Sequence, residues 1–238
     1  NNLTPEQQRE NMVWQQVRLI EYLNELPVIQ FRFDEIEADD IISYVSRLPH
    51  YKGWQKVIVS NDKDFIQLCD DETVLLRPTQ KVVHNKVNVV DDFSIHPRNF
   101  AVARAIAGDA SDNLVGVPRA GLKSIAKNLN FLREDKDVTL HEVFDFCENT
   151  DSKAKFFTNI LEHKDIVISN YKLMQLYAPA ISLQSQEKVH YALNNFEHDY
   201  NKTEILRMMN QDGFGVFNWE DLHGTMNKIC IDKALKGE

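Results

Sequence analysis

Short β-branched segments alternate with helical patterns in the N-terminal part of the chain, and this alternation limits the possible folds. The run KVIVS at residues 56–60 is typical of a buried parallel strand, and TVLLR at residues 73–77 is a second run of this kind. VIQFRF at residues 28–33 alternates as a strand. Residues 36–48 have helical spacing, and so does the segment DKDFIQL between the two β-branched runs. Strands separated by helices predict an α/β fold with a parallel β-sheet flanked by helices.

Two further segments complete the expected N-terminal part. Thr4 followed by Pro5 is a helix start, and the apolar spacing extends this helix over residues 5–25. The stretch VVHNKVNVV at residues 82–90 predicts a small hairpin about Asn85. Both segments fit a sheet with covering helices.

The character of the sequence changes near residue 95. From Pro97 onward the patterns are helical, almost without strands. We therefore expect an α/β domain at residues 1–95 and a helical domain at residues 96–238. No low-complexity linker separates the two, so we expect them to pack together.

The bulk composition indicates a folded protein outside the membrane. Hydrophobic residues make up 43% of the chain and aromatic residues 10%, whereas disordered chains are poor in both. No long apolar run occurs, and no signal-peptide pattern is present, so we expect a soluble, cytoplasmic protein with no membrane partner. Cys69, Cys147 and Cys230 lie far apart without a C-x-x-C pair, which predicts buried thiols rather than disulfides or a zinc site.

Acidic side chains gather in three short stretches beside predicted element ends. The seven residues are Glu37, Asp39, Asp40, Asp62, Asp64, Asp109 and Asp112. Asp62 and Asp64 follow a predicted strand, and the crevice beyond the carboxyl ends of parallel strands is where open α/β sheets bind ligands. If the other two stretches are helical, their spacing places Glu37 and Asp40 on one face, and likewise Asp109 and Asp112.

This clustering changes what the net charge of −9 implies. Acids spread evenly over the surface would argue against a polyanionic partner such as nucleic acid. Setting the seven clustered acids aside from the 36 acidic residues leaves 29, against 27 basic residues. Like charges in one cleft raise one another's pKa, and Mg²⁺ or Mn²⁺ relieves that repulsion through the oxygen ligands it prefers. The acidic balance is therefore compatible with a phosphate-rich partner.

Each acidic stretch also has a purely structural interpretation. The stretch at residues 37–40 is typical of an acidic first turn, favoured by the helix dipole. Asp62 and Asp64 are compatible with a solvated loop, and GDASDN with a turn capped by side chains. The three together, in this order, favour a shared site. Residues 70–72 and 91–92 are interpreted as solvated acidic turns.

A glycine-containing turn leads from the last acidic stretch into two lysines. Gly116 and Gly121 flank Pro118, and glycines let backbone amides approach a phosphate closely. Lys123 and Lys127 are four residues apart and lie on one helical face, where they can add two phosphate contacts that carry no base information. The alternative is a plain packing corner between two helices.

The motifs EADD, SNDKDFIQL and GDASDNLVGVPRAGLKSIAK, in this order, resemble those of the 5′ nuclease family over about residues 10–130. That family includes bacteriophage 5′-3′ exonucleases, flap endonucleases and the 5′ nuclease domain of bacterial DNA polymerase I. The resemblance implies a PIN-like α/β core. It also implies a helix-three-turn-helix motif at about residues 100–130, related to the helix-hairpin-helix, that grips duplex DNA.

The resemblance implies metal-dependent hydrolysis of phosphodiesters near the 5′ ends of branched or nicked DNA or RNA–DNA duplexes, in replication, primer and flap removal, and repair. Two Mg²⁺ or Mn²⁺ ions would be held by two carboxylate sets, and a monovalent cation would sit at the DNA-binding turn. The sets are Glu37, Asp39, Asp40 and Asp62 for one ion, and Asp64, Asp109 and Asp112 for the other, with Asp39, Asp62 and Asp64 as catalytic residues. The implied DNA contacts are Gly116, Val117, Arg119, Gly121, Lys123 and Lys127. Implied partners are DNA with a 5′ end or flap and a single-strand-binding protein or clamp; we expect a monomer, in the host cytoplasm if the source is viral.

Two departures from the family pattern stand out. Family members begin with a strand carrying an aspartate, a second acidic strand end and a helical arch, and none of these precedes Asn1. We expect that this N-terminal segment lies outside the given sequence. Arg119 also stands where the family has glycine in its GVPG turn.

Two other functions remain open. Phosphatases of the haloacid dehalogenase type also use D-x-D after a strand, but Phe65 stands where they have Thr or Val, and Gly108–Asp109 follows a helical pattern. A structure-specific DNA-binding module whose acids hold only structural metal is the second alternative.

Overall fold

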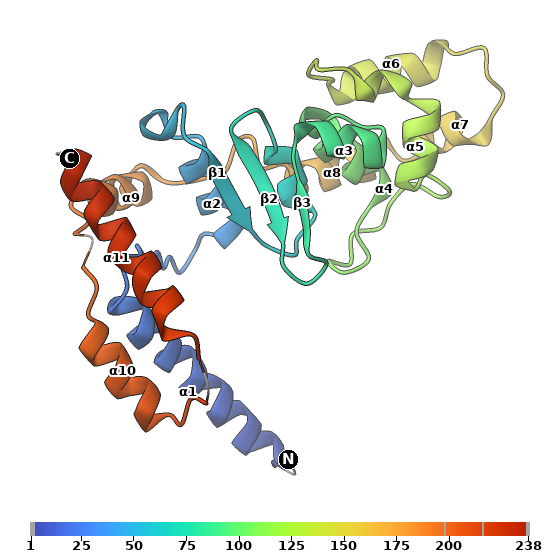
Figure 1. Ribbon diagram of the computed structural model, residues 1–238. Helices are drawn as coiled ribbons and strands as arrows, with labels where there is room; N and C mark the ends of the chain where they lie inside the picture. Colours follow the sequence, from blue (N-terminus) through green and yellow to red (C-terminus); the bar gives the residue numbers. More distant parts are fainter. Residues whose placement is uncertain (1–2, 198, 216, 237–238) are drawn as a thin grey trace. The chain divides into compact units, whose positions relative to one another are not determined.

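The computed structural model describes residues 3–197, 199–215 and 217–236, and the chain divides into two compact units (Figure 1). The first unit combines Asn1–Asp34 with Ser182–Glu238, and the second is Glu35–Ile181. All seven predicted acidic site residues belong to the second unit.

The second unit contains a three-stranded sheet and most of the helices. Its elements are α2 (Ala38–Ser46), η1 (Pro49–Tyr51), β1 (Lys56–Val59), η2 (Asp64–Leu68), β2 (Thr73–Arg77), β3 (Val82–His84), α3 (Lys86–Phe93), η3 (Pro97–Asn99), α4 (Phe100–Ala107), α5 (Leu122–Asn128), η4 (Asn130–Arg133), α6 (Leu140–Asn149), α7 (Lys155–Glu162) and α8 (Lys164–Met174). Here α denotes an α-helix and η a 3₁₀ helix. Figure 1 shows β2 between β1 and β3.

The sheet is mixed rather than wholly parallel. β1 and β2 run parallel, with Lys56 opposite Thr73 and Val59 opposite Leu76. β3 is antiparallel to β2 and follows it through a short turn, which only antiparallel neighbours permit. The predicted parallel pairing is therefore present between β1 and β2. It is wrong for β2 and β3, which are antiparallel.

The segment at residues 82–90 does not form the predicted hairpin. Its first residues make β3, and α3 begins directly after Asn85. The Asn85 side chain accepts hydrogen bonds from the N–H groups of Val87 and Asn88, and the Asn88 side chain accepts one from the Asn85 N–H at 2.7 Å. This reciprocal capping satisfies the first donors of a helix, so it decides between helix and strand for an apolar run that is compatible with both.

Helix α4 is the centre of the core. Its residues Phe100, Ala101, Val102, Ala103, Ala105 and Ile106 are all buried. Phe100 packs edge to face against Phe93 at the end of α3, with ring centroids 5.3 Å apart. The division predicted near residue 95 thus falls inside the second unit, where the sheet and the helices after it share one hydrophobic core.

The segment after α8 is tied back onto the sheet side of the unit. The buried Gln67 of η2 donates to the Met174 carbonyl at 3.0 Å and accepts from the Leu176 N–H at 2.7 Å. Ser43 of α2 and Arg47, the C-cap residue of that helix, both donate to the Leu176 carbonyl. These bonds hold residues 174–177 against α2 and η2.

The first unit is helical. Its elements are α1 (Pro5–Asn24), α9 (Leu183–Asn194), α10 (Lys202–Gln211) and α11 (Trp219–Lys236). Arg18 of α1 pairs with Asp212 at the end of α10 at 2.7 Å, and the Tyr22 hydroxyl donates to the same carboxylate at 2.6 Å. The helix predicted over residues 5–25 is present as α1.

The first unit differs from the sequence analysis in two ways. Apolar residues of the spacing that predicts α1, such as Val17 and Leu19, are exposed, and α1 has no buried residue. Residues 28–33 form no strand, and the described part of the chain gives them no β partner. An alternating sequence becomes a strand only where a neighbour accepts its backbone hydrogen bonds, which explains this second difference.

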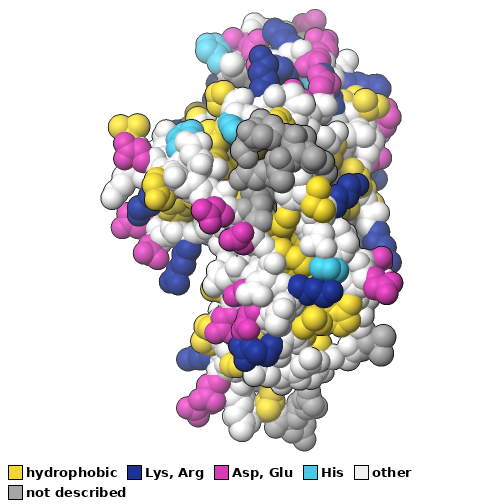
Figure 2. All heavy atoms as spheres, turned by 60° about the vertical axis from the view of Figure 1, so that its left-hand side comes forward, with side chains coloured by type: hydrophobic (Ala, Val, Ile, Leu, Met, Phe, Trp, Pro, Cys, Tyr) yellow, Lys and Arg dark blue, Asp and Glu magenta, His cyan; other side chains and the backbone are white. Residues whose placement is uncertain are grey.

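Surface charge and cysteine placement agree with the composition. On the face drawn in Figure 2, acidic and basic side chains are interspersed and do not gather into one large patch of a single sign. Cys69 and Cys147 are buried, Cys230 is partly exposed, and none of them forms a disulfide. Among the described helices, none has both the length and the apolar character needed to cross a membrane.

Candidate functional site

The first acidic stretch lies at the start of α2. Glu37 is the N-cap residue, but its side chain makes no capping hydrogen bond. Asp39 and Asp40 occupy the first helical turn, where the helix dipole favours negative charge. Glu37 is exposed and the other two are half-buried. The Glu37 carboxylate is therefore not used as a cap.

The second acidic stretch follows β1. The N–H of Asp62 donates to the Ser60 hydroxyl at 3.1 Å, and the Asp62 carboxylate accepts the N–H of Asp64 at 2.8 Å. These two bonds make a tight turn at the carboxyl end of the strand, where Asp64 opens η2. Both carboxylates therefore lie beyond the carboxyl end of β1, as the sequence predicts.

The third acidic stretch is a turn closed on itself after α4. Asp109 and Leu114 exchange backbone hydrogen bonds of 2.8 and 2.7 Å, and Asp112 lies exposed in the loop between them. Gly108, at φ +73°, and Gly116 hold the two ends of this loop together. A Cβ on Gly116 would lie 1.9 Å from the Ala107 carbonyl oxygen, so only glycine allows this closeness.

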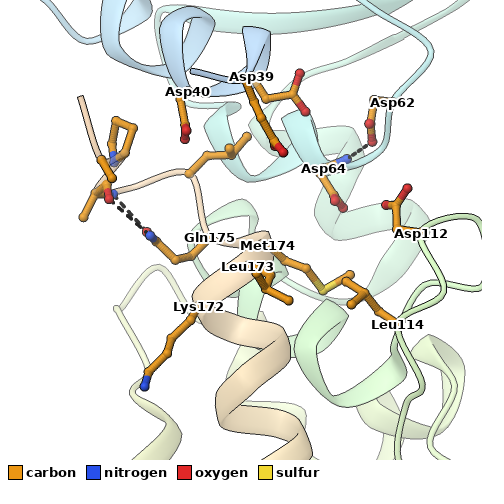
Figure 3. Close-up of a pocket in the computed structure, with 15 residues that line it drawn as sticks. Asp39, Asp40, Asp62, Asp64, Asp112, Leu114, Lys172, Leu173, Met174 and Gln175 are labelled. Carbon is orange, nitrogen blue, oxygen red and sulfur yellow. Dashed lines mark hydrogen bonds between the residues drawn. The ribbon is translucent and has the colours of Figure 1, made fainter. Parts of the chain in front are cut away.

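Six of the seven predicted carboxylates line one pocket of about 580 Å³ (Figure 3). They are Glu37, Asp39, Asp40, Asp62, Asp64 and Asp112. Its other walls include Leu114 and residues 172–176, which run from the end of α8 into the segment held by Gln67. Figure 3 shows Asp39, Asp62, Asp64 and Asp112 near one another, with Lys172 pointing away from them. Segments far apart in the sequence therefore supply one acidic pocket.

Asp109 does not line this pocket and is paired instead with an arginine, Arg104, that the sequence analysis missed. Arg104 of α4 donates from Nε to Asp64 at 2.9 Å and from Nη2 to the Asp109 carboxylate. Only 11% of the Arg104 side chain is exposed, so its charge is held between these two acids. The available signal was a lone arginine within the apolar run FAVARAIA, since buried charges are almost always paired.

Three carboxylates, those of Asp64, Asp109 and Asp112, are suitable ligands for a hard divalent cation. Carboxylate oxygens of Asp64, Asp109 and Asp112 all lie within 4.8 Å of one another. The acidic pocket contains neither a histidine nor a cysteine among its lining residues. A ligand set made only of oxygen favours Mg²⁺, Mn²⁺ or Ca²⁺ over Zn²⁺ or Cu²⁺.

The electrostatics of the pocket are those of crowded negative charge. Burial, followed by the charges of Asp62, Glu37, Asp64 and Asp40, raises the pKa of Asp39 to about 6. Burial also raises the pKa of Asp64, against the opposing charge of Arg104. Hydrogen bonds from Ser111 lower the pKa of Asp109. A carboxylate placed only to complement a helix dipole would have a lowered pKa, so the raised value of Asp39 favours a ligand-binding role.

Stabilisation by a divalent cation is expected to increase as the pH rises through about 6. The folded-state pKa of Asp39, about 6, lies above its unfolded value near 3.9, so this group contributes stability at low pH that is lost as pH rises to 6. A bound cation removes that cost, because it stabilises the ionised carboxylate. Thermal melts with and without Mg²⁺ or Mn²⁺ between pH 5 and 7.5 measure this.

The Asp39→Asn variant is the control for this pH dependence, because it removes the titrating group. Its melting temperature should rise less on adding cation, and the rise should vary less with pH. If the cation raises the melting temperature of the unchanged protein equally at pH 5 and pH 7.5, the assignment of Asp39 as a cation ligand is contradicted.

The predicted DNA-binding residues divide into buried and exposed groups. Val117 is buried and its N–H donates to the Ile106 carbonyl at 2.8 Å, so it anchors the turn. Gly116 serves the close backbone approach described above, whereas Gly121, the N-cap of α5, faces open space. Two of the predicted contacts are therefore explained by packing alone.

Three exposed cations remain in this segment. They are Arg119, Lys123 and Lys127. Arg119 has φ +64°, in the left-handed region that favours glycine. The Pro118 carbonyl accepts a hydrogen bond from Asn159 of α7 at 2.9 Å and steadies the turn. The buried Ile125 fixes the opposite side of α5 in the core.

The phosphatase alternative finds no support in this geometry. Gly108 and Asp109 follow helix α4, whereas that alternative needs them at the end of a strand. The D-x-D pair follows β1, as either function would require. The arrangement of the third acidic stretch therefore separates the two.

Comparison with known sequences gives several matches, among them a family model and the relatives that follow. The family described as "5′-3′ exonuclease, N-terminal resolvase-like domain" matches residues 5–94. A 5′-3′ exonuclease of Buchnera aphidicola is 35% identical over 115 residues, which cover 48% of this chain and 40% of that protein. A 5′-3′ exonuclease of Aquifex aeolicus is 29% identical over 141 residues, covering 59% of this chain and 45% of that protein. The match to DNA polymerase I of Streptococcus pneumoniae is 32% identical over 130 residues and covers 53% of this chain and 14% of the polymerase. The chain thus matches less than half the length of these relatives.

Comparison with solved structures shows the same fold. The bacteriophage T5 5′-exonuclease with bound zinc has a TM-score of 0.65 at 18% identity, covering 82% of this chain and 73% of that one. A complex of the bacteriophage T5 flap endonuclease with DNA and metal ions has a TM-score of 0.63 at 17% identity, covering 88% and 73%. Both support an α/β fold.

Proposed function

We propose that the chain belongs to the 5′ nuclease family and that it is a divalent-metal-dependent 5′ nuclease. Its substrates would be branched or nicked DNA, or RNA–DNA duplexes, cut near their 5′ ends. Exonucleases and a flap endonuclease among the similar proteins support this proposal. DNA polymerase I among the relatives supports a role in replication.

The observation that carries the proposal is the convergence of three distant acidic stretches on one pocket. Acidic side chains from all three stretches line it together, and among the described residues only Arg104 forms ion pairs with Asp64 and Asp109. So many carboxylates in one place lower stability unless cations compensate them. A protein keeps such an arrangement where the cations do chemistry.

We infer that two ions are bound, Mg²⁺ or Mn²⁺. Glu37, Asp39, Asp40 and Asp62 would hold the first, and Asp64, Asp109 and Asp112 the second, whose oxygens already lie within 4.8 Å. When bound, such ions lower the pKa of the attacking water and stabilise the leaving oxygen. The chain's own contribution is to fix the carboxylates: the turn at Asp62 positions Asp64, and Arg104 sets the side chains of Asp64 and Asp109.

Cleavage of a duplex with a 5′ flap is the direct test. The protein is incubated with a 5′-labelled flap duplex in Mg²⁺, in Mn²⁺ and in EDTA, and the products are sized. We expect cutting near the flap junction or from the 5′ end in either metal and none in EDTA. Binding without cutting at any metal concentration would refute the nuclease and favour the non-catalytic DNA-binding module.

That module remains the second candidate because of Arg104. Its guanidinium pairs with two of the three clustered carboxylates, so part of their negative charge is compensated without any ion. A nuclease and a binding module differ in the outcome of the cleavage test alone.

We propose that α4, the turn at residues 108–121 and α5 form the helix-three-turn-helix that holds duplex DNA. Arg119, Lys123 and Lys127 are the exposed cations that support this proposal. They would contact phosphates and so bind independently of sequence. A monovalent cation at this turn, RNA–DNA substrates and a single-strand-binding protein or clamp as partner belong to the same proposal.

Lys123→Ala is expected to weaken binding of unrelated duplexes by a similar factor. Removal of one phosphate contact should reduce the slope of log affinity against log salt by about 0.9. Fluorescence anisotropy over a salt series measures both quantities. The control is Lys52→Ala, an exposed lysine near the start of β1. An unchanged slope would remove Lys123 from the DNA-binding surface.

A further inference from the structure

A second pocket of about 400 Å³ adjoins the acidic pocket. It is lined by Asn61, Asp62, Lys63, Arg77, Arg104, Asp109, Ser111 and Asp112. Asp62 and Asp112 line both pockets and form the wall between them. The acidic pocket has a single cation among its lining residues, Lys172, which points away from the carboxylates in Figure 3. The second pocket has three cations, so positive charge lies on one side of the carboxylates.

The three cations differ in how their charge is compensated. Arg104 is neutralised by Asp64 and Asp109. Arg77 and Lys63 form no ion pair with a carboxylate in the described part of the chain. Two cations at this pocket are therefore not ion-paired, although the carboxylates of Asp62 and Asp112 line it as well.

Arg77 is held in place without being neutralised. It is the last residue of β2, and its Nε and Nη2 both donate to the Asn61 carbonyl oxygen, at 3.1 and 2.8 Å. Asn61 is itself fixed, because its side chain accepts the N–H of Thr79 at 3.1 Å. A guanidinium has five N–H donors in a planar fork, so this anchoring leaves donors available for an anion.

We propose that this second pocket binds a backbone phosphate of the strand being cut, adjacent to the reacting phosphodiester, through Lys63 and Arg77. This inference rests on the proposed nuclease function. A strand whose reacting phosphate lies over Asp62 and Asp112 places its neighbouring phosphates on either side of that wall. Of the described residues that line the two pockets, Lys63 and Arg77 are the cations without an ion pair that lie beside this wall, so they attract a phosphate on their side. The pocket thereby sets the direction in which the strand crosses the carboxylates.

Phosphate binding here is coupled to the divalent cation. Asp62, Asp109 and Asp112 line the same pocket and repel an anion until their charge is compensated. The contribution of Lys63 to DNA affinity is therefore expected in the presence of a divalent ion and to be much smaller in EDTA.

The test replaces one backbone phosphate at a time by a neutral methylphosphonate near the cut position of a flap duplex. Affinity is measured by anisotropy in Ca²⁺ and in EDTA, and kcat/KM in Mg²⁺. The variant is Lys63→Ala, whose lost side chain makes no hydrogen bond or ion pair described for the fold, and Lys52→Ala is the matched lysine control. We expect Lys63→Ala to weaken binding in Ca²⁺ about 10-fold, equal to one charge-assisted contact. The methylphosphonate at the matching position should weaken binding by the unchanged protein similarly and cost Lys63→Ala nothing further.

The outcomes separate this inference from the proposed function. Normal cutting, with Lys63→Ala indistinguishable from Lys52→Ala at every position, overturns the phosphate pocket and leaves the nuclease standing. If Lys63→Ala removes the effect of the methylphosphonate at one position in the binding assay, but the protein cuts no substrate, the pocket is supported and the nuclease is refuted. If the effect of Lys63→Ala on binding disappears only when the terminal 5′ phosphate is removed, the pocket binds that terminal group. This result overturns the assignment to an internal phosphate.

Discussion

Asp62→Asn is expected to lower the rate of flap cleavage by at least about 100-fold while DNA affinity stays within a small factor. Outer-shell changes around metal ligands alone cost 10–100-fold, so loss of a direct ligand should reach at least the upper end of that range. The substitution keeps the local fold, because an asparagine side-chain oxygen still accepts the Asp64 N–H that Asp62 accepts at 2.8 Å. Single-turnover cleavage and anisotropy binding on one flap duplex measure the two quantities.

Asp70→Asn is the matched control for that variant. Asp70 forms a similar turn, in which its carboxylate accepts the N–H groups of Glu72 and Thr73 at 2.8 and 2.6 Å, but it lines neither pocket. Its cleavage rate should equal that of the unchanged protein. Equal losses in both variants would mean that turn stability, and not metal binding, explains the effect of Asp62.

Gly116→Ala is expected to destabilise the second unit by about 3 kcal/mol and lower its melting temperature by about 10 °C. The added Cβ would lie 1.9 Å from the Ala107 carbonyl oxygen and 2.7 Å from the Gly108 nitrogen, both backbone atoms that cannot rotate away. The closed loop that carries Asp109 and Asp112 must then open, so the affinity for Mn²⁺ should fall as well. Differential scanning calorimetry and a Mn²⁺ titration measure the two effects.

Gly121→Ala provides the comparison within the same turn. Its Cβ would meet nothing within 4 Å, and its φ of −71° suits any residue. We expect a change in the free energy of unfolding smaller than about 1 kcal/mol. Similar destabilisation in the two variants would show that the turn is sensitive to any side chain, and would contradict the close-approach explanation for Gly116.

The acidic positions are the part of the site that sequence patterns predict well. Asp62 follows β1 and Asp39 lies in the first turn of α2, as the local periodicity indicates. Position beside a strand or helix end is a local property, and residue type and spacing encode it directly. The helix at residues 5–25 was predictable for the same reason.

The errors arose where a segment's partner decides its structure. Residues 28–33 alternate as a strand but have no β neighbour among the described residues. Residues 82–90 contain enough β-branched residues for two strands, yet the reciprocal caps of Asn85 and Asn88 start a helix. Periodicity does not report whether a neighbour is present, and short apolar runs fit both helix and strand.

Local order along the chain was enough to identify the acidic motifs, the chemistry of oxygen ligands and the glycine turn before the lysines. Only the tertiary structure places Arg104 between Asp64 and Asp109, and Lys63 beside Arg77 at a second pocket. These pairs are 40, 5 and 14 residues apart, and no helix or strand period relates them. The physical reason is that charge compensation depends on distance in space, which the packing of α4 and the parallel pairing of β1 with β2 determine.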